Sequence, residues 1–170
     1  MRKSVTGAIV VAALSTGLAI AAGPAGARSV PACGNHSLAV SHNHSQGAMG
    51  HSNIIIRFKN VSSSACSLYG YPGLDALGSY GTVLKHAKRT VHGFTGGASS
   101  LQTIVVQPGH FASADVEWMN FNPKTSGDCQ WSSAIATTPA NTSHTVTFPI
   151  SVSLCALQVH ATVAGKTGNS

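Results

Sequence analysis

Apolar and polar residues alternate with a period of two along much of the chain, and this pattern constrains the fold more than any other feature. Alternation of this kind is typical of β-strands that have one buried and one solvated face. In one segment it predicts that Val116 and Trp118 face the core while Asp115 and Glu117 face solvent. The clearest segments are residues 53–60 (NIIIRFKN), 111–119 (FASADVEWM), 145–152 (TVTFPISV) and 156–163 (ALQVHATV).

Turn signals separate these segments, among them Tyr71-Pro72-Gly73 and Pro108-Gly109. No segment has the 3.6-residue period of an amphipathic helix. About seven to nine short strands with frequent turns predict an all-β chain, an antiparallel β-sandwich of immunoglobulin-like type. A closed barrel is the competing architecture. We expect one domain over residues 28–170 with a core of about 33–163, and a loose tail over residues 165–170.

The N-terminal residues predict export. Arg2 and Lys3 precede an apolar run from Ala8 to Ala22, and small residues follow at 25–27. This order is typical of a secretory signal peptide, here residues 1–27. The run is too short to span a membrane comfortably, and no later segment is long enough. We therefore expect a secreted, extracellular protein that is either free or held at the cell wall.

The mature part contains all four cysteines, Cys33, Cys66, Cys129 and Cys155. An even number behind a leader predicts two disulfides. Three pairings are possible, and we favour Cys33–Cys66 with Cys129–Cys155 because each closes a local loop. Each bond would then contribute about 3.5 kcal/mol. A zinc site would require close cysteine pairs, which the sequence lacks.

The charge pattern argues against a nucleic-acid partner. Charged residues make up 8% of the chain, and without Arg2 and Lys3 eight basic residues face four acidic ones. The basic residues are scattered, whereas nucleic-acid binding calls for a dense basic face with aromatic residues. Weak attraction to an anionic cell wall or membrane surface remains compatible with this charge. We expect a monomer with no nucleic-acid partner and no membrane span.

Several blocks of the sequence resemble a known family. They are FKNVSSSACSLYGYPGLDALG (58–78), VVQPGHFASADVEW (105–118), and two further cysteines around a final hairpin. Together they resemble the secreted actinobacterial domains catalogued as domain of unknown function 4232, over about Cys33 to Val163. The resemblance implies an exported β-sandwich, and it brings no catalytic residues.

The stretch SHNHSQGAMGH (41–51) offers a candidate metal site. If it connects two strands of a hairpin, His42, His44, Met49 and His51 could meet at the hairpin mouth. Imidazole and thioether are suitable ligands for copper. The competing interpretation is a polar loop, and the family resemblance favours it, because such domains commonly carry a glycine-rich loop ending in Gly-His here.

Asp115 and Glu117 are the candidate catalytic pair. They share one face of a predicted strand, with side chains about 7 Å apart. That spacing could suit a glycosidase. A solvent-facing strand would show the same alternation, and no Gly-x-Ser-x-Gly elbow supports a serine hydrolase.

The block Tyr69–Gly73 is a candidate binding loop, with Tyr69, Tyr71, Pro72 and Gly73 as its residues. Pro72 would pre-set a turn, and Gly73 would supply a backbone conformation that other residues resist. The alternative is a structural corner beside Cys66.

The leading hypothesis is an exported, non-enzymatic binding or interaction module with an unknown extracellular or cell-envelope ligand and no cofactor. The first alternative is a secreted copper-binding protein that uses residues 42–51. The second is a hydrolase that uses Asp115 and Glu117.

Overall fold

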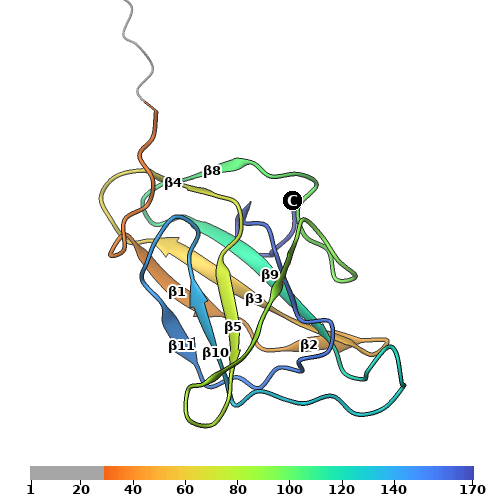
Figure 1. Cartoon of the computed structure of the whole chain (residues 1–170). Helices are drawn as coiled ribbons and strands as arrows, with labels where there is room; N and C mark the ends of the chain where they lie inside the picture. Colours follow the sequence, from red (N-terminus) through yellow and green to blue (C-terminus); the bar gives the residue numbers. More distant parts are fainter. Residues whose placement is uncertain (1–28) are drawn as a thin grey trace, which may run out of the picture.

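The computed structural model describes residues 29–170, which contain β-strands and no helix (Figure 1). The all-β prediction is confirmed. The predicted leader, residues 1–27, lies outside the described residues. The strands are β1 (Leu38–His42), β2 (Gln46–Ala48), β3 (His51–Asn60), β4 (Cys66–Tyr69), β5 (Gly73–Leu77), β6 (Val83–His86), β7 (Lys88–Thr90), β8 (Thr103–Val106), β9 (Phe111–Met119), β10 (Ala134–Thr138), β11 (Val146–Phe148), β12 (Gln158–His160) and β13 (Val163–Ala164).

The larger sheet is built around the antiparallel pair β3 and β9, which runs from His51 opposite Met119 to Lys59 opposite Phe111. Its strand order is β1-β3-β9-β12-β7, with β2 also paired to β3 and β13 also paired to β9. One pair, β12 with β7, is parallel. All other strand pairs in residues 29–170 are antiparallel, as predicted.

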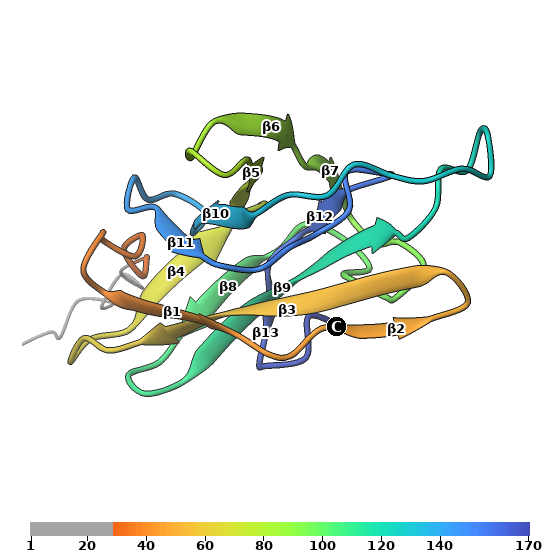
Figure 2. The ribbon, with the colours of Figure 1, turned by 90° about the horizontal axis from the view of Figure 1, so that it is seen from below.

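A four-stranded sheet of order β11-β10-β5-β6 packs over the larger sheet, and β4 and β8 form a separate two-stranded sheet. Figure 2 shows the two layers edge-on, with β5, β6, β10 and β11 above β1, β3 and β9. The predicted antiparallel β-sandwich is confirmed. Residues 29–170 contain no helix of the length and apolar character that crossing a membrane requires.

The core lies between the two layers and follows the predicted alternation. On β3 and β9, alternate side chains point toward the smaller sheet and are buried, and Leu74, Ala76 and Ile135 meet them from β5 and β10. Burial of this apolar surface stabilises the sandwich by about 25 cal/mol per Å². The contributing side chains of β3 and β9 are Ile54, Ile56, Phe58, Ala112, Ala114, Val116 and Trp118.

The predicted disulfides are confirmed. Cys33–Cys66 joins the segment before β1 to β4, and Cys129–Cys155 joins the β9–β10 connection to the segment before β12. No cysteine among residues 29–170 is free.

The prediction that Asp115 and Glu117 face solvent is wrong. Their exposed fractions are 0% and 3%. Two segments without regular alternation cover their face of the larger sheet: residues 91–98, here called the covering loop, and residues 165–170, here called the C-terminal segment. Figure 1 shows the C-terminus beside the green covering loop, and the backbone N–H of Ser170 donates to the carbonyl of Gly97.

The C-terminal segment is not the loose tail that its composition predicts. The backbone N–H of Gly168 donates to Ser113 Oγ at 3.0 Å, and Gly168 is buried against Asp115 and Ile55. Asn169 Oδ1 accepts from the backbone N–H of Gly97 at 2.6 Å. The segment therefore holds the covering loop against the sheet.

Candidate functional site

Two carboxylates and an imidazole form a buried cluster on the face beneath the covering loop. We call Asp115 and Glu117 of β9 and His160 of β12 the carboxylate–histidine cluster. His160 Nδ1 lies 3.9 Å from Asp115 Oδ2, and its Nε2 lies 3.9 Å from Glu117 Oε2. The antiparallel register of β9 and β12, with Gln158 opposite Glu117, explains this proximity.

The covering loop enters the cluster through Thr95. Its backbone N–H donates to Glu117 Oε2 at 2.6 Å. Its hydroxyl oxygen lies 2.7 Å from the same Glu117 oxygen and 2.6 Å from Asp115 Oδ2. One residue of the loop therefore bridges both carboxyl groups.

The Thr95 hydroxyl is the shared donor of the cluster. A threonine hydroxyl has one proton to donate, yet Thr95 Oγ1 is within hydrogen-bond distance of two carboxyl oxygens. Burial raises the pKa of Asp115 more than its hydrogen bonds from Thr95 and Asn53 lower it. Burial thus favours the neutral form of Asp115, and the Thr95 hydroxyl is the donor that the two carboxyl groups share.

Hydrogen bonds favour the charged form of Glu117. Burial acts to raise its pKa, but hydrogen bonds from the Thr95 N–H and hydroxyl and from the Phe94 backbone outweigh this, so the pKa is lowered. Its other oxygen accepts from Gln158 Nε2 at 3.0 Å. Asn53 of β3 likewise donates to Asp115 Oδ1 at 3.0 Å. The protein itself thus satisfies the carboxyl oxygens.

His160 differs from the carboxyl groups because neither ring nitrogen has a hydrogen-bond partner, although the side chain is fully buried. Burial lowers its pKa more than the two carboxyl groups raise it, so the neutral imidazole is favoured. Two glycines of the covering loop close over it. A Cβ on Gly93 would lie 2.8 Å from His160 Nε2, and one on Gly97 would lie 2.7 Å from Nδ1.

The predicted catalytic pair is therefore brought together but covered. A carboxylate pair with a histidine is a set that can perform acid–base chemistry. Here Thr95, Asn53 and Gln158 occupy the oxygens that a substrate would need. In this conformation the cluster fixes the position of the covering loop. Hydrolase activity itself stays a prediction.

The loop that is fixed in this way presents Phe94 at the surface. The Phe94 ring is 53% exposed and stacks on the His51 ring, with centroids 4.0 Å apart and planes 14° apart. His51 Nδ1 lies 3.5 Å from Glu117 Oε1. The stack therefore stands directly on the carboxylate–histidine cluster.

A cleft of about 400 Å³ lies beside Phe94. Two further exposed apolar side chains flank the tip of the β2–β3 hairpin: Met49, 86% exposed, and Phe121, whose ring lies against Gly50. Gly50 has a φ of 79°, and a Cβ there would collide with the Phe121 ring. We call Met49, Phe94 and Phe121 the aromatic end. The cleft is lined by Gln46, Gly47, Ala48, Asn53, Phe94 and Thr95.

The structure does not bring the predicted metal ligands together. His42 is paired with Ile56 and points to the core side, where its ring meets Phe148 edge-on at 4.8 Å. His51 points to the opposite face of the same sheet, while His44 and Met49 are exposed. Among residues 29–170, no three His, Cys, Asp or Glu side chains are arranged to hold a metal ion. Copper binding stays a prediction.

The predicted binding loop at residues 69–73 is divided between surface and interior. Tyr69 is 50% exposed on β4. Pro72 is buried, and Tyr71 packs on Ala98, Ala161 and Val163. Gly70 has the left-handed φ, 90°, that was predicted for Gly73. The β4–β5 connection turns three residues earlier than predicted because Gly73 already begins β5.

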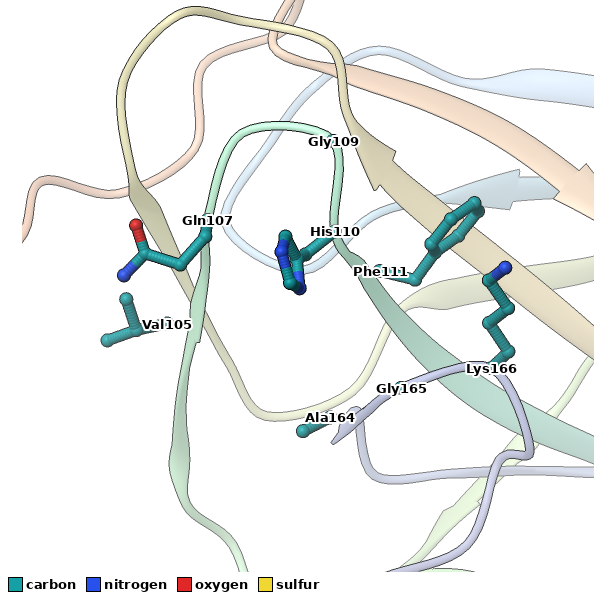
Figure 3. A pocket seen from close by; sticks show the side chains of 8 residues that line it. All are labelled: Val105, Gln107, Gly109, His110, Phe111, Ala164, Gly165 and Lys166. Atoms are coloured by element: carbon teal, nitrogen blue, oxygen red, sulfur yellow. The ribbon is translucent and has the colours of Figure 1, made fainter.

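A second open cleft of about 400 Å³ lies at the other end of the covered face, around Phe111 (Figure 3). Lys166 and His110 reach it from the C-terminal segment and from the turn before β9. Lys166 Nζ lies 4.2 Å from the centre of the Phe111 ring. Periodicity did not indicate this cleft, because the C-terminal segment that forms one wall has no strand pattern.

Sequence reasoning missed His160 and the covering loop. The alternation in residues 156–163 places Val159 on the buried face of the strand and His160 on the opposite, polar face. In the loop sequence His92-Gly-Phe-Thr-Gly-Gly97, Gly96-Gly97 was interpreted as a turn and Phe94 as a candidate exposed aromatic residue. Its three glycines around Phe94 and Thr95 were a signal of close backbone approach, but they do not say to what.

The fold and the buried cluster define a disulfide-linked β-sandwich in which one sheet face is covered by a loop and a C-terminal segment. The chain belongs to the family described as Domain of unknown function (DUF4232), whose model matches residues 33–167. No curated protein and no solved structure matches the chain.

Proposed function

We propose that the chain is an exported, non-enzymatic binding module that acts at the cell envelope and recognises its ligand with the aromatic end. The observation that carries the proposal is the stack of Phe94 on His51 above an internally bonded cluster. A recognition ring that is held in place before binding loses little conformational entropy when a ligand arrives. An exposed, fixed aromatic ring beside an open cleft has this property.

Export is supported by the leader-like residues 1–27, by the two disulfides and by the low charge content. Disulfides persist mainly in oxidising compartments outside the cytosol. The absence of any free thiol in residues 29–170 agrees with such a compartment.

Retention on isolated cell envelopes of the organism that encodes the protein tests the proposal. We expect Phe94→Ala to lower the retained fraction of the mature chain by about tenfold, roughly 1.4 kcal/mol. Thr95→Val should lower it less, because Phe94 is kept while the bond that fixes the loop is lost.

Tyr80→Ala is the matched control, since Tyr80 is an aromatic residue that is 96% exposed on the β5–β6 turn. It should leave retention unchanged. Equal retention of wild type, Phe94→Ala and Tyr80→Ala would contradict recognition by the aromatic end, and no retention of wild type would contradict action at the envelope.

A further inference from the structure

The second cleft, around Phe111, carries a cluster of positive charge. Arg57 and Lys59 of β3 lie opposite Ser113 and Phe111 of β9, and both point to the covered face. Lys59 Nζ lies 5.8 Å from the centre of the Phe111 ring, and Lys166 Nζ lies 4.2 Å from the same centre. Arg57 Nε donates to the carbonyl of Lys166 at 3.1 Å. Lys166 and His110 line the cleft, and Arg57 and Lys59 lie beside it; we call these four residues the basic cleft.

No carboxylate neutralises this cluster. Within residues 29–170, the only close pairs between basic and acidic side chains involve histidines, so none of the lysines and arginines there is paired to a carboxylate. Asp115 follows on β9, but it is sealed under Gly168 and bonded to Asn53 and Thr95. Like charges held close together without a counter-charge repel one another. An anionic ligand would relieve this repulsion.

The backbone N–H groups around the basic cleft are not available to bind an anion, so its side chains would have to do so. The N–H groups of Gly109, His110 and Gly165 are already bonded to carbonyl groups of the protein. The available donors are thus the ammonium groups, which suit phosphate oxygens as point charges. Figure 3 shows Lys166 beside the Phe111 ring, with His110 between Gln107 and Phe111.

From this arrangement we propose that the basic cleft binds a phosphodiester polymer of the cell envelope. The ammonium groups of Lys59 and Lys166 approach the same ring, and Arg57 is bonded to the Lys166 carbonyl, so three positively charged residues gather in one region of the surface. Several neighbouring positive charges favour a ligand with repeated anionic groups over one with a single charge. Phe111 is half-buried, and the exposed apolar side chain on the cleft wall, Val105, is short, so the cleft presents no exposed aromatic ring for insertion into a bilayer. The proposal concerns a different surface from the aromatic end and does not rest on recognition by Phe94.

Direct binding of purified poly(glycerol phosphate) to the mature chain, measured by titration calorimetry at about 0.15 M salt, tests the proposal. The test variant is Lys59→Gln/Lys166→Gln. Both side chains are exposed, so the fold should persist, and an unchanged melting curve checks this. We expect the double variant to bind the polymer about tenfold more weakly, roughly 1.4 kcal/mol, and with a smaller dependence on salt.

The matched control is Lys88→Gln/Lys124→Gln, which removes the same charge from β7 and the β9–β10 connection. It should bind the polymer like wild type. Inorganic phosphate should compete only at far higher concentration than the polymer, and phosphatidylglycerol vesicles should bind more weakly.

Three results would overturn the proposal. The first is the lack of a specific polymer site, seen either as an equal loss in both double variants or as no polymer binding by wild type. The second is binding of inorganic phosphate as tight as that of the polymer, which would indicate that the ligand of the basic cleft is a free anion. The third is a preference for vesicles over the polymer, which would indicate that the ligand of the basic cleft is a lipid headgroup. None of these results depends on Phe94, so they separate this site from the aromatic end.

Discussion

At the scale of single residues, His160 is the least usual side chain of the protein. It is a fully buried imidazole with two unpartnered nitrogens, placed between two carboxyl groups that bond elsewhere. An unsatisfied buried polar group costs about 1–3 kcal/mol. The protein tolerates this cost where Gly93 and Gly97 close over the ring, which indicates that the ring acts as packing surface for the loop.

The pH dependence of stability should report the buried state of His160. In the fold its pKa lies below its ordinary value of 6.5, mainly because of burial. The unfolded chain therefore takes up a proton at a higher pH than the folded chain, and the free energy of unfolding falls as pH drops below about 6.5, by at most about 1.4 kcal/mol per pH unit. Urea unfolding at several pH values should show that His160→Gln flattens this slope.

His44→Gln is the control for that measurement, because His44 is exposed; it should keep the wild-type slope. The raised pKa of Asp115 acts with the opposite sign, since it removes stability as pH rises above its ordinary value of 3.8. Parallel slopes for His160→Gln and His44→Gln would show that His160 does not titrate differently in the fold.

At the scale of elements, the covering loop depends on close approach of its backbone to the sheet. A Cβ at Gly93 would collide with Gln158 Nε2, and would lie 2.8 Å from His160 Nε2 and 2.9 Å from Glu117 Oε2. Only glycine leaves room for these three side chains. The loop and the carboxylate–histidine cluster therefore form one packed unit.

Gly93→Ala should separate the loop from the cluster. Overpacking of this kind costs about 1–3 kcal/mol, which urea unfolding can measure, and amide exchange of Thr95 and Gly97 should become faster. Gly34→Ala is the matched control, since neither glycine has a positive φ and the nearest atom to a Cβ at Gly34 is Ser37 Oγ at 3.4 Å. If the two variants were equally stable, the loop would not be tightly packed.

The same elements show how far the sequence predicts this fold. Alternation on β3 and β9 predicted the buried face correctly, because burial of apolar side chains such as Ile56, Phe58 and Val116 in an apolar layer stabilises the fold. It could not predict that the opposite face is also buried, since the cover consists of a glycine-rich loop and a C-terminal segment, neither of which has a period. Thr95 and Asp115 are 20 residues apart, and a local pattern does not encode such a contact.

At the scale of the whole molecule, the two disulfides each constrain a different part of the sandwich. Cys33–Cys66 fixes the start of the sandwich, and Cys129–Cys155 fixes the long connection that carries Phe121. Their sequence separations, 33 and 26, are similar. The loop-entropy model therefore assigns them similar contributions.

Removal of either bond should cost about 3.5 kcal/mol in the free energy of unfolding, which denaturant titration of Cys33→Ala/Cys66→Ala and Cys129→Ala/Cys155→Ala can measure. Only the second pair should also weaken envelope retention, because it frees the connection that holds Phe121 at the aromatic end. Equal retention of both variants would show that Phe121 is positioned without the disulfide.

The two tryptophans lie in contrasting surroundings, and this gives the protein an intrinsic optical probe. Trp118 is 1% exposed in the core, and its indole N–H has no partner, whereas Trp131 is 46% exposed two residues after Cys129. Iodide ions in solution reach only exposed indole rings. The fluorescence that iodide quenches therefore comes from Trp131 and reports on the surface near the second disulfide. The protected fluorescence comes from Trp118 and reports on the interior of the sandwich, and neither signal requires an attached label.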